Sequence, residues 1–355
     1  MRARSAESIA TIDGDVFVVE GAVLVSRVTK DSLAILRLDR GSLEEVPALQ
    51  LGLPEPTQTT SMRGDSITCG SLEGIFGRFP DALWLAFSFA GRSCGSVFGI
   101  SDVYRFHGGG WTLINPRIVS GGPGPIEQQS SFLISPPTWS LPRGVGFAFD
   151  NAVGDGAQGP SRFVVPLPKD APDSVLRSAR QARLTADAAT VLKNDDVVVL
   201  GRETRGSTET VRIETMSARG RRSASAPVFA DGFVASPPIA ALDGGDFAVV
   251  ARVDKPSPRW FVARVSGARA TPMTLPARGT VRGLVVADGR VWTVVSTNNE
   301  SLLFVGRIGE EPHPVASPDG HALQAAERLV SASGDEALVI FDEGAVRTLA
   351  RVTVP

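Results

Sequence analysis

The chain contains Val16-Phe-Val-Val-Glu-Gly-Ala-Val-Leu-Val-Ser-Arg-Val28 and, after a short turn, Ser32-Leu-Ala-Ile-Leu-Arg-Leu-Asp-Arg-Gly41. A second stretch aligns with it almost without gaps: Leu284-Val-Val-Ala-Asp-Gly-Arg-Val-Trp-Thr-Val-Val295, followed by Ser301-Leu-Leu-Phe-Val-Gly-Arg-Ile-Gly309. Both read as a strand, a tight turn, a buried strand, a loop, a third strand, a turn and a weaker outer strand. Gly, Asn and Asp are favoured at such hairpin turns because a positive φ costs them least. The pattern predicts a four-stranded antiparallel unit.

The first turn of this unit recurs along the whole chain at intervals of 44 to 63 residues. It falls at Glu20-Gly21, Pro80-Asp81, Arg143-Gly144, Asn194-Asp195, Gly244-Gly245, Asp288-Gly289 and Ser333-Gly334. An apolar run follows each turn, as expected of a strand that is buried on both faces. Seven such units predict an all-β, seven-bladed β-propeller of four-stranded antiparallel blades in one domain, residues 1–355. The alternatives are a β-sandwich or two smaller β domains.

The two ends of the chain indicate how the ring would close. The last unit has only three strands and finishes with Ala345–Val354, whereas a spare strand, Glu7–Ile12, precedes the first complete unit. Pairing of the spare strand with the last blade would close the ring and cover an exposed sheet edge. The expected blades are residues 14–48, 72–116, 132–168, 188–220, 237–276, 282–316, and 327–355 together with 5–12.

One hairpin carries a resemblance to known propellers. The stretch Val103-Tyr-Arg-Phe-His-Gly-Gly-Gly-Trp-Thr-Leu-Ile114 has an aromatic-rich strand, a glycine turn and a Trp-Thr pair. It resembles the outer hairpin of kelch-like and related bacterial propellers. The Gly-Gly of kelch second strands, the Trp-Asp of WD40 repeats and the boxes of sialidase-like propellers are absent from the sequence. The resemblance therefore implies the superfold and no particular family.

The charge balance gives no sign of a nucleic-acid partner. The 355 residues carry a formal net charge of −2 with a pI of about 6.0, which offers no electrostatic footprint for nucleic acid or an anionic membrane. No stretch approaches the roughly 20 apolar residues that a transmembrane segment needs. The start, Met1–Glu7, lacks the apolar core of a signal peptide, so the protein is either cytoplasmic or has lost a leader. The excess of Arg over Lys, with abundant Ala and Gly, suggests a high-GC bacterial source.

The longest connections are predicted to lie on one face of the propeller, where the links between blades and the loops from second to third strands are found. The long segments are Leu49–Phe79, Asn115–Pro142 and Asp170–Ala188. Long loops usually carry function, the alternative being decoration without a role. We also expect a short surface helix at Asp173–Arg183, where an N-cap residue precedes helix formers.

These loops favour a non-catalytic binding or scaffolding protein that presents one face to a protein or glycan. Arg and aromatic residues commonly anchor such interfaces. The candidate contact residues are Arg63, Arg92, Arg117, Glu127, Phe132 and Trp139. No cofactor is expected under this hypothesis.

The cysteines bear on the cellular compartment. Cys69 lies in the first long segment and Cys94 in the loop after the next second strand, so the predicted topology puts both on one face. A disulfide between them would imply an oxidising compartment, the periplasm or cell surface. Two unpaired thiols are the alternative, because the sequence does not fix their separation.

Four carboxylates provide the alternative, enzymatic hypothesis. Asp15, Glu73, Asp187 and Glu327 each precede or open the first strand of a predicted blade, where they would ring the mouth of a central channel. Converging carboxylates could hold Ca²⁺, as in metal-dependent propeller hydrolases or lyases. Arg282 takes the matching position in the sixth unit, so a salt-bridged rim without catalysis is the competing interpretation.

Overall fold

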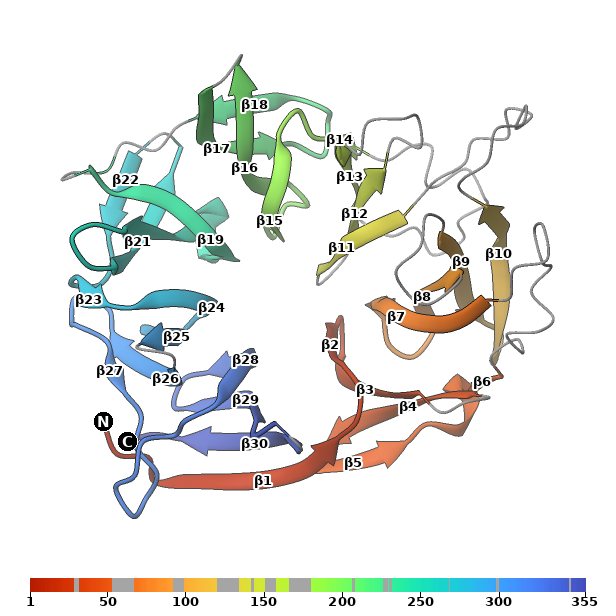
Figure 1. The fold of residues 1–355 in the computed structure, drawn as a ribbon, viewed down its shortest axis with the longest axis horizontal. Helices are drawn as coiled ribbons and strands as arrows, with labels where there is room; N and C mark the ends of the chain where they lie inside the picture. Colours follow the sequence, from red (N-terminus) through yellow and green to blue (C-terminus); the bar gives the residue numbers. More distant parts are fainter. Residues whose placement is uncertain are drawn as a thin grey trace. The chain divides into compact units, whose positions relative to one another are not determined.

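Strands account for nearly all of the regular structure in the computed structural model (Figure 1). It describes residues 1–28, 32–52, 67–91, 99–119, 134–141, 144–150, 158–165, 180–205, 208–225, 229, 232–267, 269–297, 300–344 and 346–355. Within these residues, helical turns are short 3-10 segments, among them η1 (Pro47–Leu49) and η5 (Asp243–Gly245). Neither of these turns could reach across a lipid bilayer. The described strands form seven antiparallel sheets, numbered 1 to 7 in chain order.

The chain divides into two compact units. Unit 1 comprises Met1–Asp13, Asp39–Leu43 and Ala186–Pro355, and unit 2 comprises Gly14–Leu38 and Glu44–Thr185. Sheets 1 to 3 belong to unit 2, except for Asp39–Leu43, which comprises the turn between the last two strands of sheet 1 and the adjoining residues of both strands. Sheets 4 to 7 belong to unit 1, except for the first residue of sheet 4.

Unit 2 contains three sheets, each built from strands that follow one another in the sequence. Sheet 1 consists of β2 (Val16–Val19), β3 (Ala22–Val28), β4 (Ser32–Asp39) and β5 (Ser42–Glu45), with β6 (Leu51–Gly52) also paired to β4. Sheet 2 consists of β7 (Ile67–Arg78), β8 (Ala82–Gly91), β9 (Gly99–His107) and β10 (Gly110–Val119). Sheet 3 consists of β11 (Ile134–Leu141), β12 (Gly144–Asp150), β13 (Gln158–Val164) and β14 (Arg180–Gln181).

Unit 1 contains four sheets of the same plan. Sheet 4 consists of β15 (Thr185–Val191), β16 (Val197–Arg205), β17 (Thr208–Met216) and β18 (Arg222–Ser225). Sheet 5 consists of β19 (Val234–Ala241), β20 (Phe247–Val253), β21 (Arg259–Ser266) and β22 (Arg269–Pro272), with β23 (Ala277–Arg278) also paired to β21. Sheet 6 consists of β24 (Thr280–Ala287), β25 (Arg290–Thr297), β26 (Glu300–Arg307) and β27 (His313–Pro314). Sheet 7 consists of β28 (Ala326–Ser333), β29 (Glu336–Asp342), β30 (Arg347–Thr353) and β1 (Ser5–Ile12).

The second strand of each of several sheets is buried on both faces, as its continuous apolar run predicts. In sheet 4, all four residues of Val197–Leu200 are buried, and Val198 and Leu200 pack into a core shared with sheet 5. The first strands lie next to one another within each unit: β2, β7 and β11 in unit 2, and β19, β24 and β28 in unit 1. Burial of the second strand behind a row of first strands is the packing expected of propeller blades.

Two buried tryptophan indoles fasten backbone segments to one another, and that of Trp292 joins sheet 6 to sheet 7. Trp292 of β25 is fully buried, and its indole N–H donates to the carbonyl oxygen of Gly334 in the β28–β29 turn at 3.2 Å. Trp260 of β21 is also fully buried and donates to the carbonyl oxygen of Arg278 at 3.2 Å. A buried indole has one donor to satisfy, and a backbone carbonyl at the edge of the adjoining segment satisfies it.

The spare N-terminal strand pairs with the last sheet, as the sequence predicts. β1 runs antiparallel to β30, with Ser5 opposite Thr353 and Ile12 opposite Arg347. Arg4 N–H donates to the carbonyl oxygen of Thr353 at 2.7 Å, and this extends the contact beyond the strand. This pairing gives sheet 7 its fourth strand, whereas closure of a complete ring stays a prediction.

The expected helix at Asp173–Arg183 is wrong at its C-terminal end. Arg180–Gln181 form strand β14, with Arg180 opposite Phe163 of β13, and residues 166–179 lie outside the described part of the chain. Pairing satisfies the open backbone groups of β13, which outweighs a local helix propensity of a few tenths of a kcal/mol per residue. The sequence suggested that the long segment before β14 links two sheets. It instead connects two strands of one sheet.

Candidate functional site

Each sheet has two ends that can be told apart from its connections. We call the end where the first strand begins the leading end, and the end with the first turn the trailing end. Because consecutive strands are antiparallel, the connection from second to third strand also lies at the leading end. The predicted carboxylates and the connections within the predicted segments Leu49–Phe79 and Asn115–Pro142 therefore belong to leading ends. Residues 166–179, which overlap the third predicted segment, lie between β13 and β14 and belong to the trailing end of sheet 3.

A break in strand register recurs near the leading end of first strands. It falls between Leu72 and Gly74 in β7, Ser135 and Thr138 in β11, Ser236 and Ile239 in β19, Val281 and Gly283 in β24, and Ala326 and Arg328 in β28. Such bulges re-aim the extra residue and are frequent next to functional sites. Glu73, Arg282 and Glu327 occupy these extra positions. The sequence predicts charged residues near the start of first strands, but it does not predict the β-bulges at which they lie.

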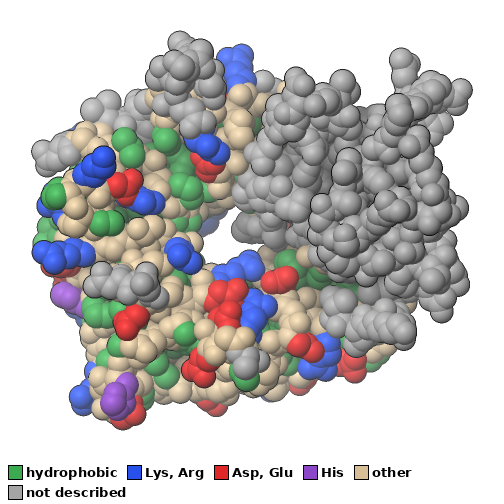
Figure 2. Space-filling view, viewed as in Figure 1, with side chains coloured by type: hydrophobic (Ala, Val, Ile, Leu, Met, Phe, Trp, Pro, Cys, Tyr) green, Lys and Arg blue, Asp and Glu red, His purple; other side chains and the backbone are tan. Residues whose placement is uncertain are grey.

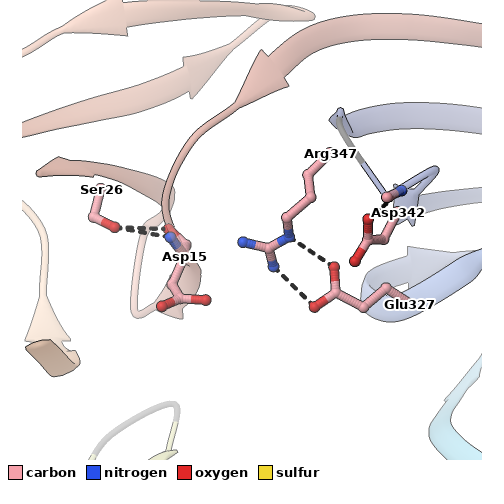
Figure 3. A network of polar contacts seen from close by, with 6 residues as sticks. Asp15, Ser26, Glu327, Asp342 and Arg347 are labelled. Carbon is pink, nitrogen blue, oxygen red and sulfur yellow. Dashed lines mark hydrogen bonds and ion pairs between the residues drawn. The ribbon is translucent and has the colours of Figure 1, made fainter. Parts of the chain in front are cut away.

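Glu327 is held by an arginine of its own sheet. The Nε atom of Arg347 lies 2.8 Å from Oε2 of Glu327, and its Nη2 atom lies 2.9 Å from Oε1, as Figure 3 shows. This two-point pairing is the strongest ion-pair geometry available to a carboxylate. Asp342, at the end of β29, accepts a hydrogen bond from Gly344 N–H at 2.8 Å. The Glu327 carboxylate thus has both oxygens engaged at the leading end of sheet 7.

Asp187 is held in a similar way at the leading end of sheet 4. Arg202, from the neighbouring strand β16, places Nε 3.2 Å from Oδ2 and Nη2 3.0 Å from Oδ1. The Asp187 side chain is 26% exposed, so water screens the pair only in part. Figure 2 shows basic and acidic side chains close together on the described surface, as paired charges require.

Asp15 is fixed through its backbone at the leading end of sheet 1. Its N–H donates to Oγ of Ser26 at 2.9 Å, and its carbonyl oxygen accepts from Ser26 N–H at 2.9 Å. Ser26 is buried, and a Cβ at Gly14 would overlap its carbonyl oxygen, so glycine permits this close approach. The Asp15 carboxylate is exposed and points away from Ser26 (Figure 3).

The remaining predicted residues are described in part. Glu73 and Cys69 lie in β7, Arg117 in β10 and Trp139 in β11, where the structure describes their backbone. The following predicted residues lie outside the described part of the chain: Arg63, Arg92, Cys94, Glu127 and Phe132. The disulfide and the contact surface therefore stay predictions.

No group of three or more His, Cys, Asp or Glu side chains within the described ranges is arranged to hold a metal ion. Sequence reasoning missed the arginines that hold two of the four carboxylates. Arg202 and Arg347 each lie at the leading end of a strand in the same sheet as their partner. Opposite charges on neighbouring strands are the signal that could have found the Asp187–Arg202 pair. Glu327 and Arg347 lie on β28 and β30, which β29 separates, so that signal does not apply to them.

No protein-family model and no curated protein matches the chain. Solved structures do match. A prolyl endopeptidase superposes with a TM-score of 0.55 and 13% identity over 98% of this chain, which spans about half (51%) of that protein. The β-propeller domain of the trilobed protease from Pyrococcus furiosus gives a TM-score of 0.50 and 10% identity, covering 99% of this chain and 94% of that one. Identities this low show the fold alone: the chain is a β-propeller, as predicted from its repeats.

Proposed function

We propose that the chain is a seven-bladed, ring-closed β-propeller that binds a protein or glycan partner without catalysing a reaction. The observation that carries this proposal is the uneven length of the leading-end connections. In unit 2 the links between sheets span residues 53–66 and 120–133, whereas those in unit 1 span residues 226–233, 279 and 315–325. The second and third strands are joined by residues 29–31, 92–98 and 151–157 in unit 2, and by residues 206–207, 254–258, 298–299 and 343–346 in unit 1. Long connections on a regular scaffold are where binding residues usually reside.

The residue types in the long connections suit an interface. Arg63, Arg92, Glu127 and Phe132 fall within them, and Arg117 and Trp139 lie on the flanking strands β10 and β11. Arg and aromatic side chains contribute most of the binding energy in typical interfaces. We expect this set to contact the partner.

The ion pairs support a role without catalysis. Arg347 and Arg202 engage both carboxylate oxygens of Glu327 and Asp187, respectively. A calcium ion needs several oxygen ligands, and it would have to displace these guanidinium groups to obtain them. The carboxylates serve better as parts of a salt-bridged rim than as metal ligands.

The cysteine positions support an extracytoplasmic location. Cys69 lies opposite Ala90 near the end of β8, and Cys94 follows that strand within the connection 92–98. Both residues thus belong to the leading end of sheet 2, where a disulfide would tether the connection to β7. We propose this disulfide and, with it, a periplasmic or cell-surface location.

Shortening the leading-end connections tests the proposed function. Deleting residues 54–62 or 121–129 is expected to weaken partner binding at least about tenfold, since a few anchoring residues dominate such interfaces. The partner is captured from envelope and soluble extracts of the source organism, identified by mass spectrometry and then titrated in purified form. Deletion of residues 169–177, an equally long piece at the trailing end of sheet 3, is the matched control and should leave affinity unchanged. Equal affinity for all three variants would refute the proposal.

Calcium titration tests the enzymatic alternative. Since Asp187 and Glu327 are already paired with arginines, calorimetry of the purified chain is expected to show no stoichiometric calcium binding at micromolar concentrations. Binding of one calcium ion that disappears in the Asp187→Asn and Glu327→Gln variants would instead support a metal-dependent hydrolase or lyase. A variant with Asp254→Asn, which lies outside the predicted rim, is the control.

A further inference from the structure

Exposed cations gather at the leading ends of sheets 5 and 6 in unit 1. Lys255 lies in the β20–β21 connection, Arg259 opens β21, Arg278 ends β23 and Arg282 is the third residue of β24. All four side chains are exposed. We call this set the basic cluster. It is a local departure from a chain whose net charge is −2.

The fold builds the basic cluster by breaking the outer strand of sheet 5. β22 ends at Pro272, and the next residues bulge out while Met273 N–H and Thr274 N–H both donate to the carbonyl oxygen of Val262, at 2.7 and 3.3 Å. Val262 N–H in turn donates to the buried Thr274 hydroxyl at 2.9 Å. The outer strand then resumes as β23. Arg278 is thereby placed directly opposite Arg259.

Buried contacts hold this arrangement from below. The Trp260 indole N–H donates to the carbonyl oxygen of Arg278, and Gly279 N–H donates to the carbonyl oxygen of Pro258 at 3.1 Å. The Trp260 ring also packs edge-on against Phe304 of β26, with 6.5 Å between ring centroids. The backbone beneath the two arginines is therefore fixed, and their side chains share one exposed end of the sheet.

The charges in the basic cluster are not balanced by neighbours. Between Lys255 and Ala287 the sequence has six Lys or Arg residues and no Asp or Glu. The adjacent acid, Asp254, is already bound to Arg252, with Nε and Oδ1 2.6 Å apart. Within the described ranges, no carboxylate forms an ion pair with a member of the basic cluster. Like charges directly opposite on paired strands destabilise a sheet, so the Arg259–Arg278 pair has a cost that folding alone does not explain.

We propose that the basic cluster binds the carboxylates of an acidic peptide segment on a partner protein. Guanidinium groups pair with carboxylates through two parallel hydrogen bonds, and adjacent arginines can engage successive Asp or Glu side chains. Sugars and single-stranded nucleic acids are usually bound with aromatic stacking as well. The aromatic residues of this stretch, Trp260 and Phe261, are both buried, which favours a peptide. This binding site lies outside the long connections of unit 2 and does not depend on them.

Binding of a labelled peptide of alternating Glu and Gly residues tests this proposal. The wild-type chain is expected to bind it at least about tenfold more tightly than the matching Gln and Gly peptide, and less tightly as salt rises. Replacing Lys255, Arg259, Arg278 and Arg282 with Ser should remove that preference. The control replaces four exposed arginines at trailing ends with Ser, which gives the same change in net charge: Arg219, Arg221, Arg269 and Arg307.

Each outcome decides the proposal. The proposal is supported if the control variant still binds the Glu peptide and the cluster variant does not. Equal loss of binding in both variants would show that net charge alone causes the binding, and would overturn the proposal. Tighter binding of a sulfated glycan or single-stranded DNA than of the Glu peptide would also overturn it. A chain with residues 54–62 and 121–129 deleted should bind the peptide like the wild type. The peptide experiment therefore tests the basic cluster even if the proposed binding by the long connections proves wrong.

The Arg278→Glu variant separates binding from folding. A glutamate opposite Arg259 replaces a repulsive pair with an attractive one, so the unfolding midpoint is expected to rise by about 1–2 °C. The affinity for the Glu peptide is expected to fall in the same variant. A fall in both quantities would assign Arg278 a structural role and overturn its role in binding.

Discussion

Replacing Trp292 with alanine is expected to lower the free energy of unfolding by about 3–5 kcal/mol. The Trp292 side chain is fully buried in a core shared by sheets 6 and 7, together with residues such as Val305 and Val339. Alanine would leave a cavity on the β25 side of this core. It would also strip the Gly334 carbonyl oxygen of the indole donor at 3.2 Å, so both packing and a hydrogen bond between the sheets would be lost.

The Trp292→Phe variant is the matched control for this prediction. Phenylalanine keeps most of the apolar volume but has no N–H, so a loss of about 1–2 kcal/mol is expected. Urea unfolding followed by circular dichroism measures both variants without relying on the tryptophan signal. Equal stability of the alanine and phenylalanine variants would show that packing of sheet 6 against sheet 7 does not depend on the size of this side chain.

The strand-turn-strand repeat could be predicted because its determinants are local. Asp288 and Gly289 adopt φ values of 48° and 77°, and a turn with two positive φ angles is one that few residue types accept. The apolar run that follows, Val291–Val295, is buried as expected of a second strand. Turn chemistry and hydrophobic pattern agree in this repeat, so its strand-turn-strand unit can be predicted from the local sequence.

Short outer strands could not be predicted because their partners decide them. Arg180–Gln181 and Ala277–Arg278 are two-residue strands, and each forms along the open edge of a third strand. A stretch this short has no periodicity of its own, and the sequence around Arg180 even favours a helix. Tertiary pairing overrides that preference. The basic cluster was missed for the same reason, since it exists only where β23 rejoins β21.

The places of Asp187 and Glu327 near the start of first strands could be predicted from the sequence, but their ion-pair partners could not. The sequence predicts that Asp187 and Glu327 open first strands, since each precedes an apolar run and a turn. Their partners, Arg202 and Arg347, lie 15 and 20 residues further along the chain. Whether these groups meet depends on strand register and on rotamers, which periodicity does not specify. The sequence therefore supplies the carboxylates of the site, whereas the fold supplies the arginines that hold them.

Gly77→Ala is expected to be the most damaging of the single-methyl additions in unit 2, with a loss of about 3 kcal/mol or more in the free energy of unfolding. Gly77 has a φ of 105°, which L-residues rarely adopt. A Cβ there would also overlap the carbonyl oxygen of Ala82 and lie 3.4 Å from Cα of Leu83, on the paired strand β8. Because the clash is with backbone, no rotamer change can relieve it.

The same position joins two sheets of unit 2, which enlarges the expected effect. The Gly77 carbonyl oxygen accepts from Glu20 N–H at 3.0 Å, and the Glu20 carbonyl oxygen accepts from Phe79 N–H at 2.9 Å. Gly309→Ala is the matched control, because Gly309 has a φ of 92° but open space around its Cβ position. The control should lose only about 1 kcal/mol, the conformational cost of a positive φ. Thermal and urea unfolding measure both variants. Equal losses would show that strain at φ, and not the backbone clash between β7 and β8, sets the requirement for glycine at position 77.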